Sequence, residues 1–536
     1  MALICLSGPP GVGKSTVGRL VAETLGYEFV DLDAKIAADN ASSVEAIFQS
    51  RGEPYFRELE AFTLAGLLDE YRDERTSTIV ALGGGAITQT SLRWRLLDEC
   101  LLISLTAPID ALLARIGKSG DRPLLSTDPA RQLRTLLEAR RGAYAECHAA
   151  VSAVGSASEV AAEVASLVRS VPLVVPLGTA TYRIHIAKGA LQKLRSLVAG
   201  YGDVSHMFVI VDEAVVAHYG NRRLEAALAE TGAAVTLLPV PSGEAAKTLE
   251  VTERIWSRLL GAGVDRRALI VSCGGGTTGD LAGFVASTVL RGLRVIHLPT
   301  TLLAMVDSSV GGKTGINRPE GKNLVGTFHQ PAAVLCDTDF LDTLPDRQIR
   351  SALAEVVKAA WLAGEEPLRR LEADVDDLLA RSPSALERAI RESVRLKIDV
   401  VREDEREQGR RRCLNLGHTV GHAFEAAAGF GALSHGEAVA LGLCAAAYLS
   451  DVLLGPKEPI LPRMRGLLAR AQLPTDFEQR INPHVLSFLL ADKKREGDGV
   501  TLVLLTAPGS VVYQMLSFAE LRQVLDAARQ GASAAI

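Results

Sequence analysis

Residues Ala2–Leu25 read ALICLSGPPGVGKSTVGRLVAETL, and this stretch decides the fold of the first part of the chain. An apolar run enters a glycine-rich loop and continues as a helical pattern, which predicts a strand, a phosphate-binding loop and a helix. In the pattern GxxxxGK[ST], glycines let successive backbone N–H groups face a phosphate, Lys14 reaches the terminal phosphates, and the Ser15 hydroxyl ligates magnesium. The sequence therefore predicts a site for a nucleoside triphosphate and Mg²⁺ that is made by Gly8, Gly11, Gly13, Lys14, Ser15 and Thr16.

The residues after this loop indicate which kind of molecule accepts the phosphoryl group. Asp31 and Asp33 end a second expected strand, spaced so that both carboxylates project on one side, one for magnesium and one for a substrate hydroxyl. Arg57 can clamp a carboxylate, and the three glycines 83–85 let backbone approach a ligand closely. The stretch GDRPLL around Arg122 predicts a mobile lid that carries a cation. Each residue alone is also typical of a surface charge or a turn, but together they favour a kinase for a carboxylated polyol.

Over residues 1–170 the chain resembles shikimate kinase, through GxxGxGKST, DxD, GExxFRxxE, the triple glycine, RPLL and RxxxY. The resemblance implies an α/β P-loop domain. It implies that ATP and Mg²⁺ are held by Lys14, Ser15, Asp31 and Arg115. It implies that shikimate is held by Asp33, Arg57, Gly84, Gly85 and Arg140. The residues implied in catalysis are Lys14, Asp33 and Arg122.

The rest of the chain shows a change of pattern after a proline-containing segment, residues 171–178, which predicts an extended linker. From 179 to 337 short apolar runs alternate with helical patterns, which indicates βαβ units and a mainly parallel sheet. Residues 338–536 are predominantly helical, with a short hairpin at 500–515. We therefore expect a second α/β domain followed by a mainly α-helical one.

A second glycine-rich loop lies in the second α/β region, where an expected strand runs into CGGGTTGD, residues 273–280. Gly274, Gly276 and Gly279 form a GxGxxG between strand and helix, which favours pyrophosphate binding by backbone amides. This signal is weak alone, because the usual acidic residue about twenty positions later is missing. Asp212, at the end of a strand, is the better candidate for the ribose hydroxyls.

Residues Leu414–Glu437, LNLGHTVGHAFEAAAGFGALSHGE, contain three of the ten histidines. If residues 415–428 are helical, His418 and His422 lie on one face, and His435 follows a turn. Together with Glu355, converging imidazoles suit a two-histidine, one-carboxylate metal site with open positions for a substrate. A histidine pair on an alanine-rich helix is also typical of polar packing, so both interpretations remain open on the residues alone.

From residue 179 to 528 the chain resembles 3-dehydroquinate synthase, through SGEAAKTLE, GGGTTGDLAGF, LPTTLLAMVDSSVGGKTGIN, AEVVK, LNLGHTVGHAFE, SHGEAVALG and DKK. The resemblance implies an NAD site of Asp212, Glu244, Lys247, Gly275, Gly276, Asp280, Thr300 and Thr301. It implies a Zn²⁺ or Co²⁺ site of Glu355, His418 and His435. It implies substrate contacts from Arg291, Asp307, Lys313, Lys322, Asn323, Lys358, Lys397, Arg411, Asn415, His422 and a lysine of the DKK run, here Lys493. The residues implied in catalysis are Lys313, Lys358, Lys397 and His422.

The implied substrate of the second half is 3-deoxy-D-arabino-heptulosonate 7-phosphate. The metal would chelate its hydroxyls, NAD would take up and return a hydride, and phosphate elimination with an aldol step would give 3-dehydroquinate. The alternatives are a P-loop kinase of another specificity, joined to a related sugar-phosphate cyclase or to a metal-dependent NAD polyol dehydrogenase. Lys322, Asn323 and Arg411 fit a carboxylated substrate and favour the dehydroquinate product.

Composition limits the partners of the chain. A net charge of -5 and a pI near 6.1 do not favour nucleic acid or an anionic membrane. Seven cysteines without a CxxC pair fit a reducing cytoplasm. The longest apolar helical stretch, residues 438–449, is too short to span a bilayer. We expect a cytoplasmic enzyme for small molecules, and a homodimer through the second half is compatible with the sequence.

Overall fold

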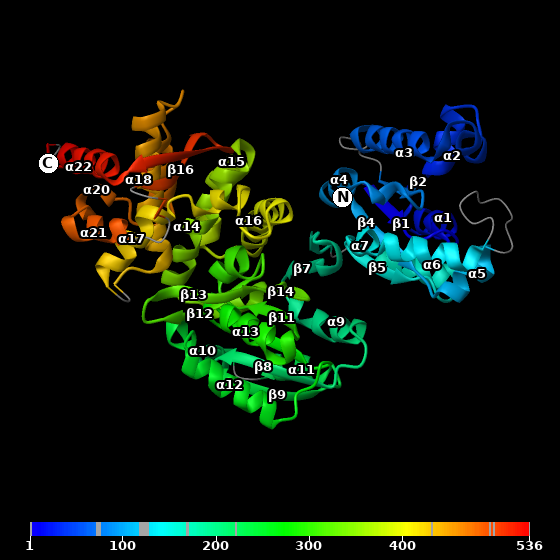
Figure 1. Ribbon diagram of the computed structural model, residues 1–536, viewed down its shortest axis with the longest axis horizontal. Helices are drawn as coiled ribbons and strands as arrows, with labels where there is room; N and C mark the ends of the chain where they lie inside the picture. The colour runs from blue at the N-terminus through cyan, green and yellow to red at the C-terminus, as the bar shows by residue number, and fades with distance from the viewer. Residues whose placement is uncertain are drawn as a thin grey trace. The chain divides into compact units, whose positions relative to one another are not determined.

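The structure is a computed structural model that describes residues 3–70, 77–116, 128–167, 171–219, 222–429, 432–491, 495–496 and 499–534. The chain divides into two compact units, Met1–Ile184 and His185–Ile536. The first is drawn from blue to cyan in Figure 1 and the second from green to red. The α/β P-loop domain, the second α/β domain and the helical domain predicted from the sequence are all present, so the predicted fold class is confirmed.

The first unit is built on a five-stranded parallel sheet of order β2-β3-β1-β4-β5. Its strands are β1 (Leu3–Ser7), β2 (Glu28–Asp31), β3 (Thr78–Ala81), β4 (Leu101–Thr106) and β5 (Ala149–Ser152). Its helices are α1 (Lys14–Leu25), α2 (Leu32–Asp39), α3 (Val44–Glu70), α4 (Thr90–Glu99), α5 (Ile109–Ile116), α6 (Pro129–Ala139), α7 (Arg141–Ala145) and α8 (Ala157–Leu167). Alternate residues of β1 enter cores on opposite faces, Cys5 on one and Ile4 on the other. The continuous apolar run of β1 is therefore explained by burial on both faces.

The second unit contains a parallel sheet whose central strands run in the order β14-β11-β10-β8-β9. They are β8 (His206–Asp212), β9 (Ala234–Val240), β10 (Leu269–Gly274), β11 (Arg294–Pro299) and β14 (Ala333–Asp337). The helices α12 (Leu249–Gly261) and α13 (Gly276–Thr288) pack into the core beside these strands. In the sheet, β9 lies beside β8 on one side, and the next strand along the chain, β10, lies beside β8 on the other side. This reversal creates a crevice at the carboxyl ends of β8 and β10, where such sheets bind ligands.

The segment that we expected to be an extended linker, residues 171–178, differs from that prediction. Leu173–Val175 form strand β6, and all three residues are buried. β6 pairs antiparallel with β7 (Tyr182–Ala187). Consecutive apolar side chains of an extended segment have to be covered on both faces, so this stretch is part of a sheet.

The helical part of the second unit brings three helices together through glycines. These are α14 (Asp346–Ala363), α17 (His418–Ala428) and α18 (His435–Leu454). A Cβ added at Gly442 of α18 would overlap the carbonyl oxygen of Gly417, directly before α17. A Cβ at Gly436 would overlap the carbonyl oxygen of Ser351 on α14. The backbones approach so closely that only glycine fits, and this contact fixes the relative positions of the helix starts.

The remaining elements of this part frame those three helices. They are β12 (Lys313–Arg318), β13 (Gly321–Phe328), α15 (Glu365–Leu379), α16 (Pro383–Glu403), α19 (Ile460–Arg470), α21 (Pro483–Ala491), β16 (Gly499–Ala507), β17 (Ser510–Ser517) and α22 (Phe518–Ala534). β12 and β13 form a separate antiparallel hairpin. The hairpin predicted at 500–515 is present as β16 and β17.

Helix α18 corrects the prediction of a short apolar helix at 438–449. It has 20 residues, and its mean hydropathy of 1.6 makes it long and apolar enough to cross a membrane by length and composition. However, 67% of the most apolar 18-residue part of this helix is buried inside the protein, as expected for a core helix. A capping box of Ser434 and Glu437 starts the helix before the apolar run, and at its other end the helix continues to Leu454.

Candidate active sites

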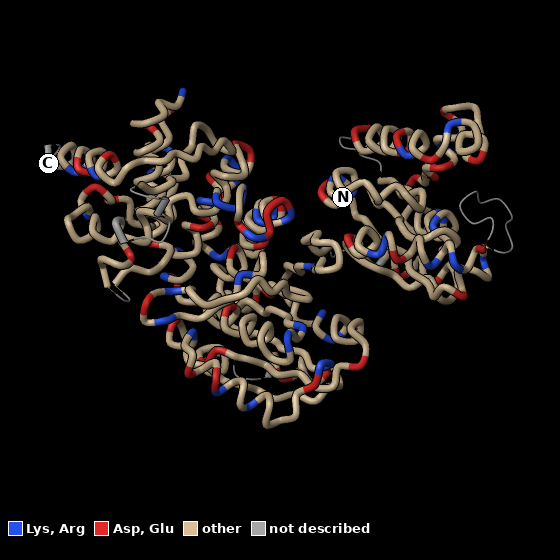
Figure 2. The backbone as a smooth tube through the Cα atoms, viewed as in Figure 1, with Lys and Arg blue, Asp and Glu red and all other residues tan. Residues whose placement is uncertain are grey.

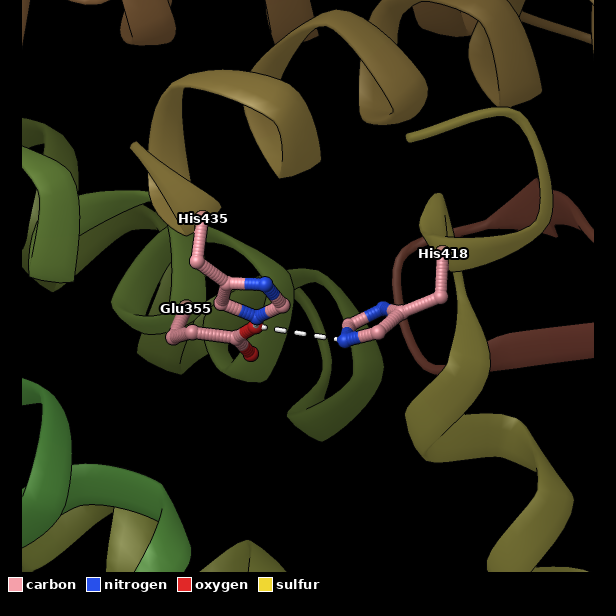
Figure 3. Close-up of side chains that lie close together, drawn as sticks. All are labelled: Glu355, His418 and His435. Atoms are coloured by element: carbon pink, nitrogen blue, oxygen red, sulfur yellow. Dashed lines mark ion pairs between the residues drawn. The ribbon is translucent and has the colours of Figure 1, made fainter. Parts of the chain in front are cut away.

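Three predicted metal ligands meet in the second unit at the glycine-mediated contact of α14, α17 and α18. Glu355 comes from the middle of α14, while His418 and His435 are the first residues of α17 and α18. Glu355 Oε1 lies 3.4 Å from His418 Nε2 and 3.4 Å from His435 Nε2. Figure 3 shows the two imidazoles directed at the carboxylate. One ligand atom from each of the three residues lies within 4.8 Å of the others, a spacing that suits a single ion.

The other ring nitrogen of each histidine has a partner of its own. His418 Nδ1 lies 3.1 Å from the carbonyl oxygen of Leu416, and His435 Nδ1 lies 3.3 Å from Glu425 Oε2. Because both partners accept hydrogen bonds, each Nδ1 is assigned the proton and each Nε2 the lone pair. This tautomer presents the lone pairs of both Nε2 atoms to the space beside Glu355.

The electrostatics of this cluster suit a divalent cation. Burial would raise the pKa of Glu355, but Lys358 and His418 hold it well below its usual range. Burial and Lys358 lower the pKa of His418, which keeps that imidazole neutral. Hydrogen bonds to Glu355 and Glu425 outweigh the effect of burial and raise the pKa of His435 to about 10. A metal ion therefore has to displace the proton of Nε2 before it can bind there. Both oxygens of Glu355 are buried, and the charged groups beside them are Lys358 and the two histidines. The residues present therefore fit a Zn²⁺ or Co²⁺ ion.

His422 lies beside this cluster without belonging to it. Its ring centroid is 5.3 Å from that of His418 and 6.2 Å from that of His435. The part of the chain that the structure describes gives one set of candidate ligands, and His422 is not in it. This placement agrees with the prediction that His422 contacts a substrate, which itself stays a prediction.

A second group of predicted residues gathers at the crevice between β8 and β10. Asp212 ends β8, Gly274 ends β10, and Thr300 follows β11 and donates its N–H to Gly274 O at 2.9 Å. Gly275 caps helix α13, whose first turn has no acidic side chain and leaves backbone N–H groups for an anion. An added Cβ at Gly274 would lie 3.0 Å from Asp212 Cβ, so the loop passes directly beside the candidate ribose ligand. This cradle fits a dinucleotide.

The other predicted residues of the dinucleotide site lie around this loop. Lys247 Nζ is buried and lies 2.6 Å from Asp280 Oδ2, and it also donates to Asn323 Oδ1. Burial raises the pKa of Asp280, and Lys247 opposes that shift. Glu244 accepts a hydrogen bond from Asn317. Thr301 accepts one from the N–H of Ala304, which places its side chain at the start of the following helix.

Each predicted substrate lysine within the described residues faces a carboxylate. Lys397 Nζ lies 2.6 Å from Asp307 Oδ1, and Lys358 pairs with Glu355. Burial would raise the pKa of Asp307, but Lys397 and Lys358 bring it down to about 2. Burial lowers the pKa of Lys397, and Asp307 opposes that shift. The cations are therefore held charged by neighbouring anions, and Figure 2 shows basic and acidic residues interspersed along the chain.

Two glutamates that the sequence did not single out hold the remaining polar groups. Glu407 pairs with Lys313 and accepts a hydrogen bond from Asn415 Nδ2 at 3.0 Å. Glu425 Oε1 lies 2.7 Å from Lys322 Nζ. These pairs join residues 94 and 103 positions apart, and such contacts leave no local signal in the sequence.

The other predicted substrate contacts are less clustered. Arg411 is buried, and its Nη2 donates to Gly311 O at 3.0 Å. Arg291 is exposed, and no ion pair joins it to another residue of the described ranges. Lys493 and, in the first unit, Arg122 with its expected lid lie outside the described residues.

The phosphate loop of the first unit has the predicted geometry. Gly8, Gly11 and Gly13 have φ values of 140°, 81° and 101°, which side-chain-bearing residues rarely adopt. Lys14 Nζ donates hydrogen bonds to Gly8 O at 3.0 Å and to Pro9 O at 3.3 Å, so the side chain lies against the loop. Ser15 and Thr16 lie in the first turn of α1. Arg115 donates to the carbonyl oxygen of Val12 at 3.2 Å, so it supports the loop directly. This cradle fits a triphosphate with Mg²⁺.

The two aspartates correct our expectation that both project from a strand. β2 ends at Asp31, and α2 begins at Leu32. Asp31 caps α2, because its Oδ1 accepts hydrogen bonds from the N–H groups of Asp33 and Ala34 at 3.2 and 3.3 Å. The carboxylate of Asp33 instead points toward Gly83, where an added Cβ would lie 2.9 Å from Asp33 Oδ1.

The predicted acceptor residues of the first unit converge around the triple glycine. A Cβ at Gly85 would overlap the guanidinium of Arg57, and Arg140 donates to Gly84 O at 2.7 Å. Glu60, which the sequence interpretation left without a role, lies 2.7 Å from Arg57 Nη1. Burial raises the pKa of Glu60, and Arg57 opposes that shift. Two cations near the buried carboxylate of Glu60 suit a ligand with a carboxylate and hydroxyls.

Comparison with known proteins agrees with this division of sites. The shikimate kinase family model matches residues 10–169, and the models "3-dehydroquinate synthase N-terminal" and "3-dehydroquinate synthase C-terminal" match residues 237–351 and 352–495. The 3-dehydroquinate synthase of Symbiobacterium thermophilum is 44% identical over 338 residues, which are 63% of this chain and 94% of that protein. The chain belongs to the 3-dehydroquinate synthase family, with a shikimate kinase domain preceding the synthase.

Two solved structures resemble the synthase part in fold. One is 2-deoxy-scyllo-inosose synthase complexed with carbaglucose-6-phosphate, NAD⁺ and Co²⁺, with a TM-score of 0.59 and 28% identity over 64% of this chain and 96% of that one. The other is the 2-epi-5-epi-valiolone synthase of Streptomyces hygroscopicus with NAD⁺ and Zn²⁺ bound. It has a TM-score of 0.58 and 28% identity over 65% of this chain and 97% of that one. The chain is thus more similar in sequence to the dehydroquinate synthase above than to these related cyclases.

Proposed function

We propose that this chain catalyses two reactions of aromatic-precursor biosynthesis at two separate sites. The first unit phosphorylates shikimate with ATP to give shikimate 3-phosphate. The second converts 3-deoxy-D-arabino-heptulosonate 7-phosphate into 3-dehydroquinate and phosphate. The observation that carries the proposal is the triad of Glu355, His418 and His435, together with the buried lysines paired beside it.

In the kinase site, the chain's own groups bind and orient both substrates. The N–H groups of the glycine loop and Lys14 hold the phosphates, while Ser15 and Asp31 would hold Mg²⁺. Arg57 and Arg140 hold the carboxylate of shikimate, and Asp33 accepts the proton of the attacking hydroxyl. Neighbouring Glu60 lies against Arg57 and fixes its guanidinium. ATP with Mg²⁺ supplies the phosphoryl group and shields its charge.

In the synthase site, Glu355, His418 and His435 would hold Zn²⁺ or Co²⁺, and the loop from Gly274 to Gly276 would bind the pyrophosphate of NAD. When bound, these groups would supply a Lewis acid for a substrate hydroxyl and a reversible hydride acceptor.

The lysines and His422 act directly on the substrate. Lys313 and Lys322 bind the phosphate and carboxylate groups, and Lys358 and Lys397 stabilise negative charge that develops during elimination. His422, one turn from His418, holds or relays a proton at the reacting hydroxyls. These roles rest on where the side chains lie and on the pairs that they form.

The domain boundaries, the compartment and the assembly belong to the same proposal. We place the kinase at residues 1–170, the NAD-binding part of the synthase at 179–337 and its metal-binding part at 338–536. The enzyme works in the cytoplasm, which suits its seven free, buried cysteines. It forms a homodimer through the synthase half.

The test uses one purified sample and two assays. Shikimate-dependent ADP formation reports the kinase, and NAD-dependent release of phosphate from the heptulosonate phosphate reports the synthase. Both rates are expected in the same preparation. Failure of one assay, with the other intact, would refute the function assigned to the corresponding half.

A further inference from the structure

Glu425 lies on α17 and contacts two residues with different tasks. Its Oε2 lies 3.3 Å from Nδ1 of His435, and its Oε1 lies 2.7 Å from Nζ of Lys322. Its side chain is 22% exposed, so water screens these contacts only partly. One carboxylate thus joins a candidate metal ligand to a lysine of the β12–β13 hairpin.

The position of Glu425 on its helix explains how it reaches His435. Glu425 follows His418 by seven residues, which is two helical turns, so both side chains lie on one face of α17. That face packs against α18, which begins at His435. The same helix therefore supplies one metal ligand and the acceptor for the Nδ1 proton of another.

We propose that Glu425 is a positioning residue for the metal site. It holds the Nδ1–H of His435, so that the Nε2 lone pair faces Glu355 and the ion. A carboxylate in this place orients the ring and makes the imidazole a stronger ligand. The inference deepens the proposed function, because it rests on the metal site of Glu355, His418 and His435.

The contact with Lys322 gives the site a second property. The ammonium group of Lys322 partly neutralises the carboxylate of Glu425. The hydrogen bond from His435 Nδ1 to that carboxylate is therefore weaker than it would be without Lys322. An anion that attracts Lys322 leaves the full charge of Glu425 to His435. Anion binding at the hairpin and metal binding at the triad therefore strengthen one another, as linkage requires.

The experiment measures zinc binding without any assay of activity. The full-length chain is stripped of metal, and its dissociation constant for Zn²⁺ is determined by competition with a chromophoric chelator. The variants are Glu425→Ala, Glu425→Gln and Lys322→Ala. The matched control is Glu392→Ala, because Glu392 is similarly exposed, at 25%, and pairs with Arg370 at 2.9 Å.

We expect Glu425→Ala to raise the dissociation constant for Zn²⁺ at least about tenfold, and Glu392→Ala to leave it unchanged. Glu425→Gln keeps an acceptor for His435 and loses at least about threefold. Lys322→Ala binds zinc as tightly as the wild type or more tightly. A smaller loss in Glu425→Ala, or an equal loss in Glu392→Ala or Lys322→Ala, would overturn the proposal.

Two further outcomes are separable. If Glu425→Ala does not fold, the nearly isosteric Gln variant decides, and a loss smaller than threefold there overturns the proposal. If the wild-type chain itself binds no zinc at the triad, the proposed function of the synthase fails as well. The wild-type measurement therefore distinguishes failure of the metal site from failure of the role of Glu425.

Discussion

The phosphate loop of the kinase and the synthase site hold their lysines with different groups. In the kinase site, Lys14 donates to carbonyl groups of its own loop. In the synthase site, Lys247, Lys358 and Lys397 each lie against a carboxylate. Carbonyl groups of the loop thus help to place Lys14 for the charge of an incoming nucleotide, whereas carboxylates hold the buried lysines of the synthase. Removing a charge should therefore remove a ligand contact in the first site, but leave a buried partner unpaired in the second.

The largest expected effect tests whether the first site works alone. Lys14→Ala should lower shikimate phosphorylation by about a thousandfold, because a preorganised cation at the transferring phosphoryl is lost. Phosphate release by the synthase should not change. The control is Lys35→Ala, which removes an exposed lysine that lies 3.6 Å from Asp39 in the same unit. An equal loss of both activities in Lys14→Ala would contradict the separation of the two sites.

The second effect tests the metal site in the same manner. His418→Ala should lose its zinc, measured as metal content after dialysis, and lower phosphate release by about a hundredfold or more. Shikimate phosphorylation should be unaffected. His484→Ala, which changes an exposed histidine of the same unit, should keep both metal and activity. Full metal content in His418→Ala would show that His418 is not a ligand.

The third effect sharpens the contrast in buried charge. Lys247→Met leaves the carboxylate of Asp280 unpaired and should reduce the free energy of unfolding of the second unit by about 3 kcal/mol. Arg388→Met removes an arginine that is 48% exposed from its pair with Asp374, and it should change the free energy of unfolding by less than about 1 kcal/mol.

The fluorescence of Trp256 can report this unfolding in urea. Its ring centroid lies 6.3 Å from that of Phe284, and it packs against the core of the unit. The measurement uses a chain in which Trp94 and Trp361 are replaced by phenylalanine. Equal shifts in the two variants would remove the distinction between the buried and the exposed pair.

The smallest effect concerns the acceptor side of the kinase site. In Gly85→Ala the added methyl group overlaps the guanidinium of Arg57 and has to displace it. The KM for shikimate should rise about tenfold, equal to about 1.4 kcal/mol, with the KM for ATP unchanged. Gly66→Ala, on α3 with open space around its Cα, should leave both constants as they are. Unchanged KM for shikimate in Gly85→Ala would exclude Arg57 as its carboxylate ligand.

The sequence predicted the features that depend on a short run of residues. The glycine loop before Lys14 and the glycine loop after β10 could be read directly, because their conformations require glycine at fixed spacing. His418 and His435 were found because three histidines crowd one short stretch. Glu355 lies far away in the sequence, so the residues alone made it only a candidate third ligand, and the family resemblance then implied the same residue.

The features that the sequence did not give depend on tertiary contacts or on competing local bonds. Asp33 was expected at the end of a strand, but the side chain of Asp31, the last residue of β2, caps α2 and ends the strand before Asp33. Helix α18 begins before its apolar run because Ser434 and Glu437 cap it. Glu425 carries no local signal for its contact with Lys322, which is 103 residues away. Fold class was thus predictable from pattern, and the carboxylate partners of the site were not.

The most direct test of the account follows one sample through the synthase reaction with and without its metal. Phosphate release from the heptulosonate phosphate should require catalytic NAD, stop when a chelator removes zinc, and return when Zn²⁺ is added. No net NADH should accumulate, because the hydride is returned. Release of NADH in step with substrate consumption, or full phosphate release from the metal-free chain, would contradict the account.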